Sequence, residues 1–135
     1  MSILEQIRDA GIVGCGGAGF PTHAKLSGKG HRWLILNGAE FEPLVGTDRW
    51  LMRELPGDIV TAAAAVTKEI GAQECVIGLK KAYTREIAAL EAAIKKLPGT
   101  APVVRLHTMD SFYPAGDEQV LVYEFTGQVV PPAGI

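Results

Sequence analysis

The sequence predicts an α/β domain with three layers, in which a small, mostly parallel sheet is flanked by helices. Three short apolar runs, 33–36, 75–79 and 103–107, alternate with helical patterns. Strands that alternate with helices of ten or more residues form a parallel sheet covered by helices. The length of 135 residues is typical of one domain, so we expect residues 1–135 to fold as a single unit.

The first elements are a short helix and a strand. Apolar residues recur at helical spacing between Ser2, a favoured N-cap residue, and Gly11, a favoured helix end. This pattern predicts a helix over 2–10. The run 33–36 is apolar throughout and ends at Asn37, which is typical of a strand that is buried on both faces.

Two helices are predicted before the second strand. Thr47 is expected to cap the first, over 47–55, and Pro56 separates it from the second. Gly71 is expected to end the second helix. The apolar stripe predicted for that helix consists of Ile59, Ala62, Ala63, Val66 and Ile70.

The second half of the chain repeats this alternation. A strand is predicted over 75–79, then a helix capped by Thr84, then a strand over 103–107. A last helix is expected to start at Asp117. It would provide the remaining helix of the three-layer arrangement.

Composition and charge exclude several classes of function. Thirteen basic and 15 acidic residues give a net charge of −2, which provides no electrostatic basis for binding nucleic acid. The longest apolar run is far shorter than the ~20 residues of a membrane span. The N-terminus has neither the basic nor the apolar part of a signal peptide. Because there are only two cysteines, we expect a cytoplasmic location with free thiols.

The histidines and cysteines predict no metal site. No C-x-x-C pattern occurs, and His23, His31 and His107 lack the spacing of metal ligands. Cys15 and Cys75 are far apart in the sequence, and we assign neither a role.

A glycine-rich loop is the first candidate for a binding site. Residues 14–19 satisfy the pattern G-x-G-x-x-G of dinucleotide-binding loops, and Glu40 lies about 20 residues further on. That motif requires a preceding strand, whereas a helix is predicted here, so an ordinary Rossmann site is excluded. Glycines still expose backbone N–H groups to a phosphate, and Pro21 can start a helix whose N-terminus favours an anion. The alternative is a tightly packed turn.

Two polar clusters are further candidates. Asn37, Glu40 and Glu42 follow the first strand at its carboxyl end, where open α/β sheets bind their ligands. Their oxygens could accept hydrogen bonds from ribityl or ribose hydroxyls, and the alternative is a solvated acidic loop. Asp117 and Glu118 start the last helix, where N-capping and the helix dipole already explain acidic residues.

Three stretches taken together resemble one family. They are GCGGAGFPTHAKL at 14–26, NGAEFEP at 37–43 and YPAGDEQ at 113–119. These motifs are similar to the flavoprotein domain shared by the RnfC-like proteins, which include PduS and PrdC, and by the NADH-oxidising subunit of respiratory complex I. The similarity covers nearly the whole chain, and the combination of motifs favours the RnfC side.

The resemblance implies a site for FMN, with NADH as the substrate. The glycine loop would wrap the flavin and its phosphate, Lys25 would add positive charge, and Phe20 would stack on the nicotinamide nucleotide. Asn37 and the two acids after it would contact the isoalloxazine or ribityl part, and the second acidic pair would flank flavin and nucleotide. The expected cofactor-binding residues are Gly14, Gly16, Gly17, Gly19, Phe20, Lys25, Asn37, Glu40, Glu42, Asp117 and Glu118.

The function implied by the resemblance is electron transfer. FMN would accept a hydride from NADH, and electrons would pass to iron–sulfur clusters in a later domain or a partner protein. Residues 129–135 resemble the middle of a connection, so we expect an N-terminal fragment of a longer RnfC-like protein, inactive in electron transfer by itself. Its location would be cytoplasmic, or at the inner face of the membrane within a complex. The alternatives are a non-catalytic fragment and a nucleotide-binding interaction module without flavin.

Overall fold

In the part of the chain that the structure describes, three strands form a parallel sheet in the order β1-β2-β3. The computed structural model describes residues 2–13, 21–26, 32–39 and 46–110, and the side chain of Lys25 is not among the described atoms. The strands are β1 (Trp33–Asn37), β2 (Glu74–Lys80) and β3 (Val103–Met109). The predicted α/β class and the parallel sheet are confirmed.

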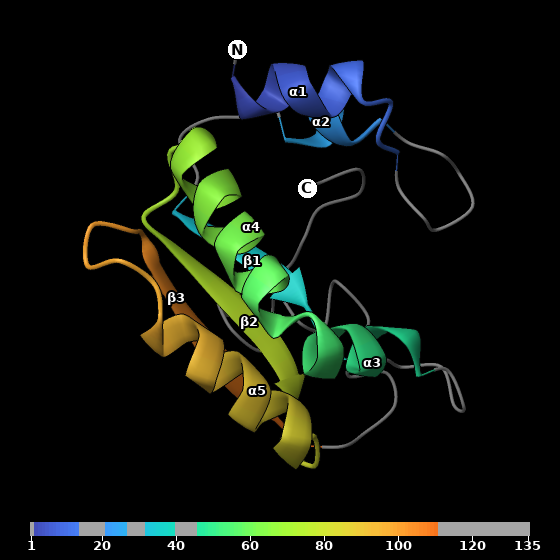
Figure 1. Cartoon of the computed structure of the whole chain (residues 1–135), viewed down its shortest axis with the longest axis vertical. Coiled ribbons are helices and arrows are strands. Elements are labelled where there is room, and N and C mark those ends of the chain that lie inside the picture. The colour runs from blue at the N-terminus through green and yellow to red at the C-terminus, as the bar shows by residue number, and fades with distance from the viewer. Residues whose placement is uncertain (1, 14–20, 27–31, 40–45, 111–135) are drawn as a thin grey trace.

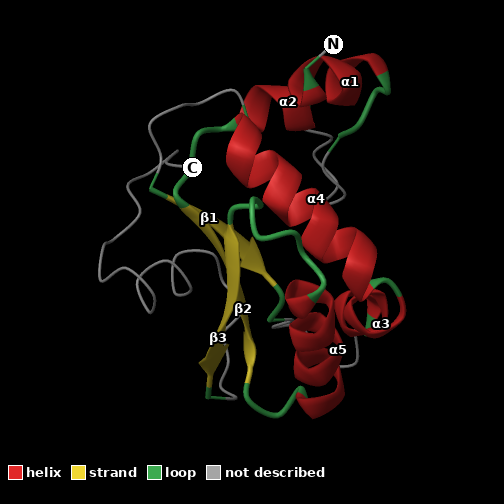
Figure 2. Ribbon diagram, turned by 60° about the vertical axis from the view of Figure 1, so that its left-hand side comes forward, coloured by secondary structure: helices red, strands yellow, loops and turns green. Residues whose placement is uncertain are grey.

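Five helices belong to the described part of the chain (Figure 1). They are α1 (Ile3–Asp9), α2 (Thr22–Lys25), α3 (Thr47–Glu54), α4 (Pro56–Glu69) and α5 (Thr84–Lys95). Figure 2 shows α3, α4 and α5 on one face of the sheet. Right-handed crossovers that advance one strand at a time in the same direction all pass over the same face. The helix expected from Asp117 lies outside the described residues, so the third layer stays a prediction.

The main core lies between the sheet and these helices. Cys75, Ile77 and Leu79 of β2 are at most 2% exposed, and they pack in one cluster with Val60 of α4 and Leu90 of α5. Burying such side chains is the main source of folding free energy. Because β2 is the central strand, its whole apolar run is buried. The edge strand β1 is only half buried over 33–36, so the expectation of burial on both faces is wrong for this strand.

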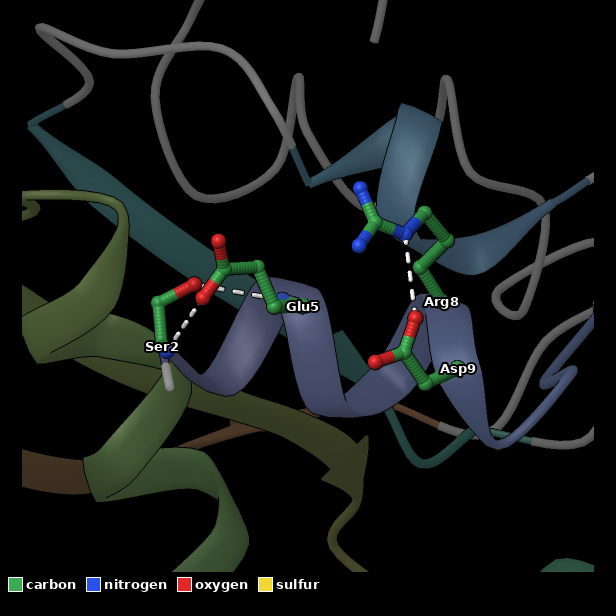
Figure 3. A network of polar contacts seen from close by, with 4 residues as sticks. All are labelled: Ser2, Glu5, Arg8 and Asp9. Atoms are coloured by element: carbon green, nitrogen blue, oxygen red, sulfur yellow. Dashed lines mark hydrogen bonds and ion pairs between the residues drawn. The ribbon is translucent and has the colours of Figure 1, made fainter.

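Both ends of the first helix agree with the sequence prediction. Ser2 is its N-cap: the Ser2 hydroxyl accepts a hydrogen bond from the Glu5 amide at 3.1 Å, and the Ser2 amide donates to Glu5 Oε2 at 2.8 Å (Figure 3). This reciprocal pair is a capping box, which satisfies two otherwise unpaired backbone donors. Gly11 and Gly71 follow α1 and α4 with φ of 69° and 72°, a conformation that favours glycine.

Two other helix starts differ from the prediction. The N-cap of α3 is Gly46 and that of α5 is Tyr83, so Thr47 and Thr84 are first helical residues and cap nothing. The buried stripe of α4 also differs, because Thr67 belongs to it whereas Ala62 is exposed. The Thr67 hydroxyl donates to the Ala63 carbonyl at 2.6 Å, which satisfies the hydroxyl inside the core. The buried residues of α4 are Val60, Ala63, Ala64 and Thr67.

Candidate functional site

The two ends of the glycine loop lie side by side. Val13 and Pro21 form an antiparallel bridge, and the Thr22 amide donates to the Ile12 carbonyl at 3.2 Å. Helix α2 starts directly after Pro21, as the sequence predicts. The loop itself, with its four predicted glycines and Phe20, lies outside the described residues.

The carboxyl end of β1 is held close to the central strand. The Gly38 amide donates to the Gly78 carbonyl at 2.7 Å, and a Cβ atom at Gly38 would lie 3.0 Å from Met52 Sδ and 3.1 Å from that same carbonyl oxygen. Only glycine allows this approach without a shift of neighbouring atoms. Asn37 precedes this contact, and its Oδ1 accepts a hydrogen bond from the Ala39 amide at 3.1 Å, which is an Asx turn.

Among the predicted site residues, Asn37 is therefore the one whose side chain is part of the described structure. It ends β1 and is exposed at the carboxyl edge of the sheet, as expected. Glu40 and Glu42 lie outside the described residues, as do Asp117 and Glu118. Their roles stay predictions.

The described residues on either side of the glycine loop do not lie next to Asn37. Both views show α1 and α2 beside the C-terminal end of α4, whereas β2 runs toward α3 and α5 (Figures 1 and 2). The carboxyl edge of the sheet thus lies at the opposite end of α4. A single site that contains both the loop and Asn37 has to span this separation.

A cavity of about 210 Å³ lies beside Asn37, between β1 and the helices α3 and α4. Its lining is mainly apolar and includes Asp48. Asn37 borders the cavity, although strand alternation directs its side chain to the other face of the sheet. Ligand pockets usually enclose roughly 300–1,000 Å³, so this cavity by itself is too small for a nucleotide. The lining residues are Leu36, Asn37, Gly38, Asp48, Leu51, Met52, Ile59 and Ile77.

Two polar residues that the sequence analysis did not assign lie near Asn37. In the sheet register, Asn37 is opposite Gly78, which is opposite His107. Paired residues of parallel strands point to the same face, so an amide and an imidazole flank a glycine on the face away from α4. Lys80 ends β2 on this same face, opposite Met109. The predicted second and third strands end at Leu79 and His107, whereas the observed strands extend to Lys80 and Met109.

A buried carboxylate joins α3 to α5. Glu86 is 0% exposed, and its Oε1 accepts hydrogen bonds from Arg49 Nε at 2.8 Å and from an Arg53 terminal nitrogen at 3.4 Å. The Arg49 guanidinium also lies 4.4 Å from the centre of the Tyr83 ring. Burial raises the pKa of Glu86, but hydrogen bonding to Arg49 and the charges of both arginines outweigh it, so that the pKa lies below its ordinary value. This cluster anchors α3, one wall of the cavity.

Other polar groups of the sheet have structural explanations. Glu74 accepts a hydrogen bond from Trp33 Nε1 at 2.8 Å and two from Arg105, both at 3.1 Å. These contacts join the three strands at their amino end, away from Asn37. Burial raises the pKa of the Cys75 thiol to about 11, so it is not a nucleophile at neutral pH.

The described part of the chain offers no membrane span and no metal centre. None of its helices is long and apolar enough to cross a membrane. Among the same residues, no group of three or more histidine, cysteine or acidic side chains could hold a metal ion.

The fold and the site define the class of protein. A parallel α/β sheet with polar residues at its carboxyl edge, in a chain whose glycine-rich stretch is flanked by residues that lie side by side, is typical of domains that bind nucleotide-like cofactors. Residues 7–135 match the family described as the Nuo51 FMN-binding domain. The chain belongs to this family.

Similar proteins include a reductase and a component of an oxidoreductase complex. The chain is 40% identical to cobalamin reductase PduS of Salmonella typhimurium, over 98% of the chain and 28% of that protein. It is 36% identical to a component of the ion-translocating oxidoreductase complex of Pseudomonas aeruginosa, over 100% of the chain and 17% of that component. The chain thus spans less than a third of the length of these relatives.

A solved structure supports the same fold. The air-oxidised crystal structure of an NAD⁺-reducing [NiFe]-hydrogenase superposes with a TM-score of 0.82 and 30% sequence identity. The match covers 96% of this chain and 25% of that one. The small parallel sheet with its helices is therefore the architecture of this family.

Proposed function

We propose that this chain is the FMN-binding part of an electron-transfer flavoprotein. The observation that carries the proposal is the match of residues 7–135 to an FMN-binding family, together with the position of Asn37 at the carboxyl edge of a parallel sheet. The described residues fit a flavin chemically, because an amide, an imidazole and an ammonium group border this edge. Such groups can donate hydrogen bonds to the ring heteroatoms of a flavin.

The roles of the chain in binding follow from its functional groups. The backbone N–H groups of the loop 14–19 would hold the phosphate, with Lys25 adding positive charge. Asn37, Glu40 and Glu42 would hold the ring or ribityl chain, and Phe20 would stack on the nicotinamide. The second acidic pair would flank both ligands. A bound flavin supplies the redox chemistry, and the protein orients it.

The direction of electron flow belongs to the same proposal. NADH is the proposed hydride donor, and the electrons would leave toward iron–sulfur clusters outside these residues. Two cysteines, one of them buried as Cys75, cannot supply the four thiolates that such a cluster usually needs. The partner is therefore a cluster-bearing domain or a separate cluster-bearing protein, in the cytoplasm or at the inner face of the membrane.

Titration of the chain with FMN, followed by visible absorption, tests the proposal. A bound flavin shows shifted and structured bands, and we expect a saturable change of this kind. Gly17→Val should weaken binding at least tenfold, because a branched side chain would obstruct the phosphate cradle. Gly99→Val is the matched control, because nothing lies within 4 Å of a Cβ at Gly99. An unperturbed FMN spectrum with the parent chain, or equal affinity in the Gly17 variant, contradicts the proposal.

A further inference from the structure

Lys80 occupies the centre of the carboxyl edge of the sheet. It is the last residue of β2, the strand between β1 and β3. Its register partner on β3 is Met109. On the other side, the last paired residue of β1 is Asn37, which is opposite Gly78, and Ala39 follows two residues later. Lys80 therefore lies at the edge where the three strands of the sheet end.

The side chain of Lys80 belongs to the face away from α4 and α5. Side chains alternate along a strand, and Leu79, which is 0% exposed, packs in the core beneath the helices. Lys80 thus shares the opposite face with Gly78. The same alternation places Asn37 and His107 on that face. The buried residues Ala39 and Met109, with the half-buried Ile35 packed against them, form a cluster there as well.

The charge of Lys80 is not matched by an acid in the described part of the chain, where no ion pair involves it. Lys80 is half buried, and its register partner Met109 is buried. The next residue differs: Lys81 is 63% exposed and pairs with Asp110 at 3.1 Å. A partly desolvated ammonium group is stabilised when an anionic group lies beside it.

We propose that Lys80 contacts the pyrimidine end of the flavin ring, at N1 and the C2 carbonyl oxygen. This inference rests on the proposed function and adds a residue to its site. Two electrons and one proton convert oxidised FMN into its anionic reduced form, and the added negative charge lies on N1 and O2. A charge near this position tunes the electronic properties of a flavin. Lys80 therefore binds reduced FMN more tightly than oxidised FMN.

The test compares the affinity of the chain for oxidised FMN and for FMN reduced anaerobically with dithionite. Lys80→Met should lower the preference for the reduced form about tenfold, which corresponds to a two-electron potential that is about 30 mV lower. Lys80→Arg keeps the charge and should retain the preference within about twofold. Lys81→Met is the matched control and should leave both affinities unchanged. Circular dichroism spectra establish that each variant is folded.

The outcomes separate this inference from the proposed function. If the parent chain binds neither form of FMN, the proposed function fails and this inference fails with it. If the parent chain binds both forms but Lys80→Met weakens them equally or not at all, the role of Lys80 alone is overturned. A shift of the same size in Lys81→Met also overturns it, because the effect would then come from the overall charge.

Discussion

Gly38 shows how a single missing side chain shapes the carboxyl edge. Its amide donates a hydrogen bond to the Gly78 carbonyl, and a methyl group at this position would lie 3.0 Å from Met52 Sδ and 3.1 Å from that carbonyl oxygen. The Met52 side chain can move, whereas the carbonyl oxygen belongs to the central strand. A substitution here changes both the cavity and the turn that follows Asn37.

We expect Gly38→Ala to lower the free energy of unfolding by about 1–2 kcal/mol, because the added methyl group overpacks this contact. Urea denaturation followed by circular dichroism measures the change. Gly57→Ala is the control: it lies in the first turn of α4 with nothing within 4 Å of the added Cβ, and it should be neutral or slightly stabilising. Equal stability of both variants would show that the Gly38 contact is not tight.

At the scale of single residues, the sequence predicted Asn37 because a strand of continuous apolar residues visibly ends there. Lys80 could not be predicted in the same way. Apolar patterning locates the middle of a strand, whereas its end depends on how far the backbone hydrogen bonds to its neighbours continue. Here β2 and β3 pair as far as Lys80 and Met109, beyond the last apolar residues of the two predicted runs.

At the scale of elements, α3 is anchored by a buried charge. Glu86 of α5 forms ion pairs with Arg49 and Arg53 of α3. Residues of α3 also line the cavity beside Asn37. Removing a partner from a buried ion pair is usually costly because it leaves the other charge desolvated. The two arginine side chains are 41% and 30% exposed, so water partly solvates them and the cost is smaller.

We expect Glu86→Gln to lower the free energy of unfolding by about 2 kcal/mol near neutral pH. The carboxyl has a lower pKa in the folded chain than its ordinary 4.5, so its stabilisation is present above that value and is lost as the pH falls through the folded pKa. The variant should therefore approach the stability of the parent in acid. Glu91→Gln, at an exposed position of α5, is the control. A stability difference that stays constant down to low pH would contradict the assignment.

The sequence could not predict this anchor. A glutamate in the first turn of a helix is ordinarily explained by the helix dipole, and Glu86 fits that pattern. Its burial follows from the packing of α3 on α5, whose contacting residues Arg49 and Glu86 are 37 positions apart. The order of the three strands and of α1, α3, α4 and α5, by contrast, followed from apolar periodicity and from glycine and proline positions, whereas α2 was indicated only by Pro21.

At the scale of the whole molecule, the central claim is that one FMN site joins the glycine loop to the carboxyl edge of the sheet. Helices α1 and α2, beside the loop, and the carboxyl end of β1 lie toward different ends of α4 (Figure 1). The claim therefore requires the ligand, with residues 14–20, to bridge two regions that are separate in the described part.

Backbone amide chemical shifts, measured by NMR while FMN is added to the labelled chain, test this claim most directly. We expect concerted shifts, with one dissociation constant, at two groups of amides. These are the amides of Val13 and Thr22 beside the loop and those of Asn37 and Gly38 at the carboxyl edge. The amide of Glu74, at the amino end of the sheet, should not shift. Shifts confined to one of the two groups, or two different dissociation constants, would contradict a single site.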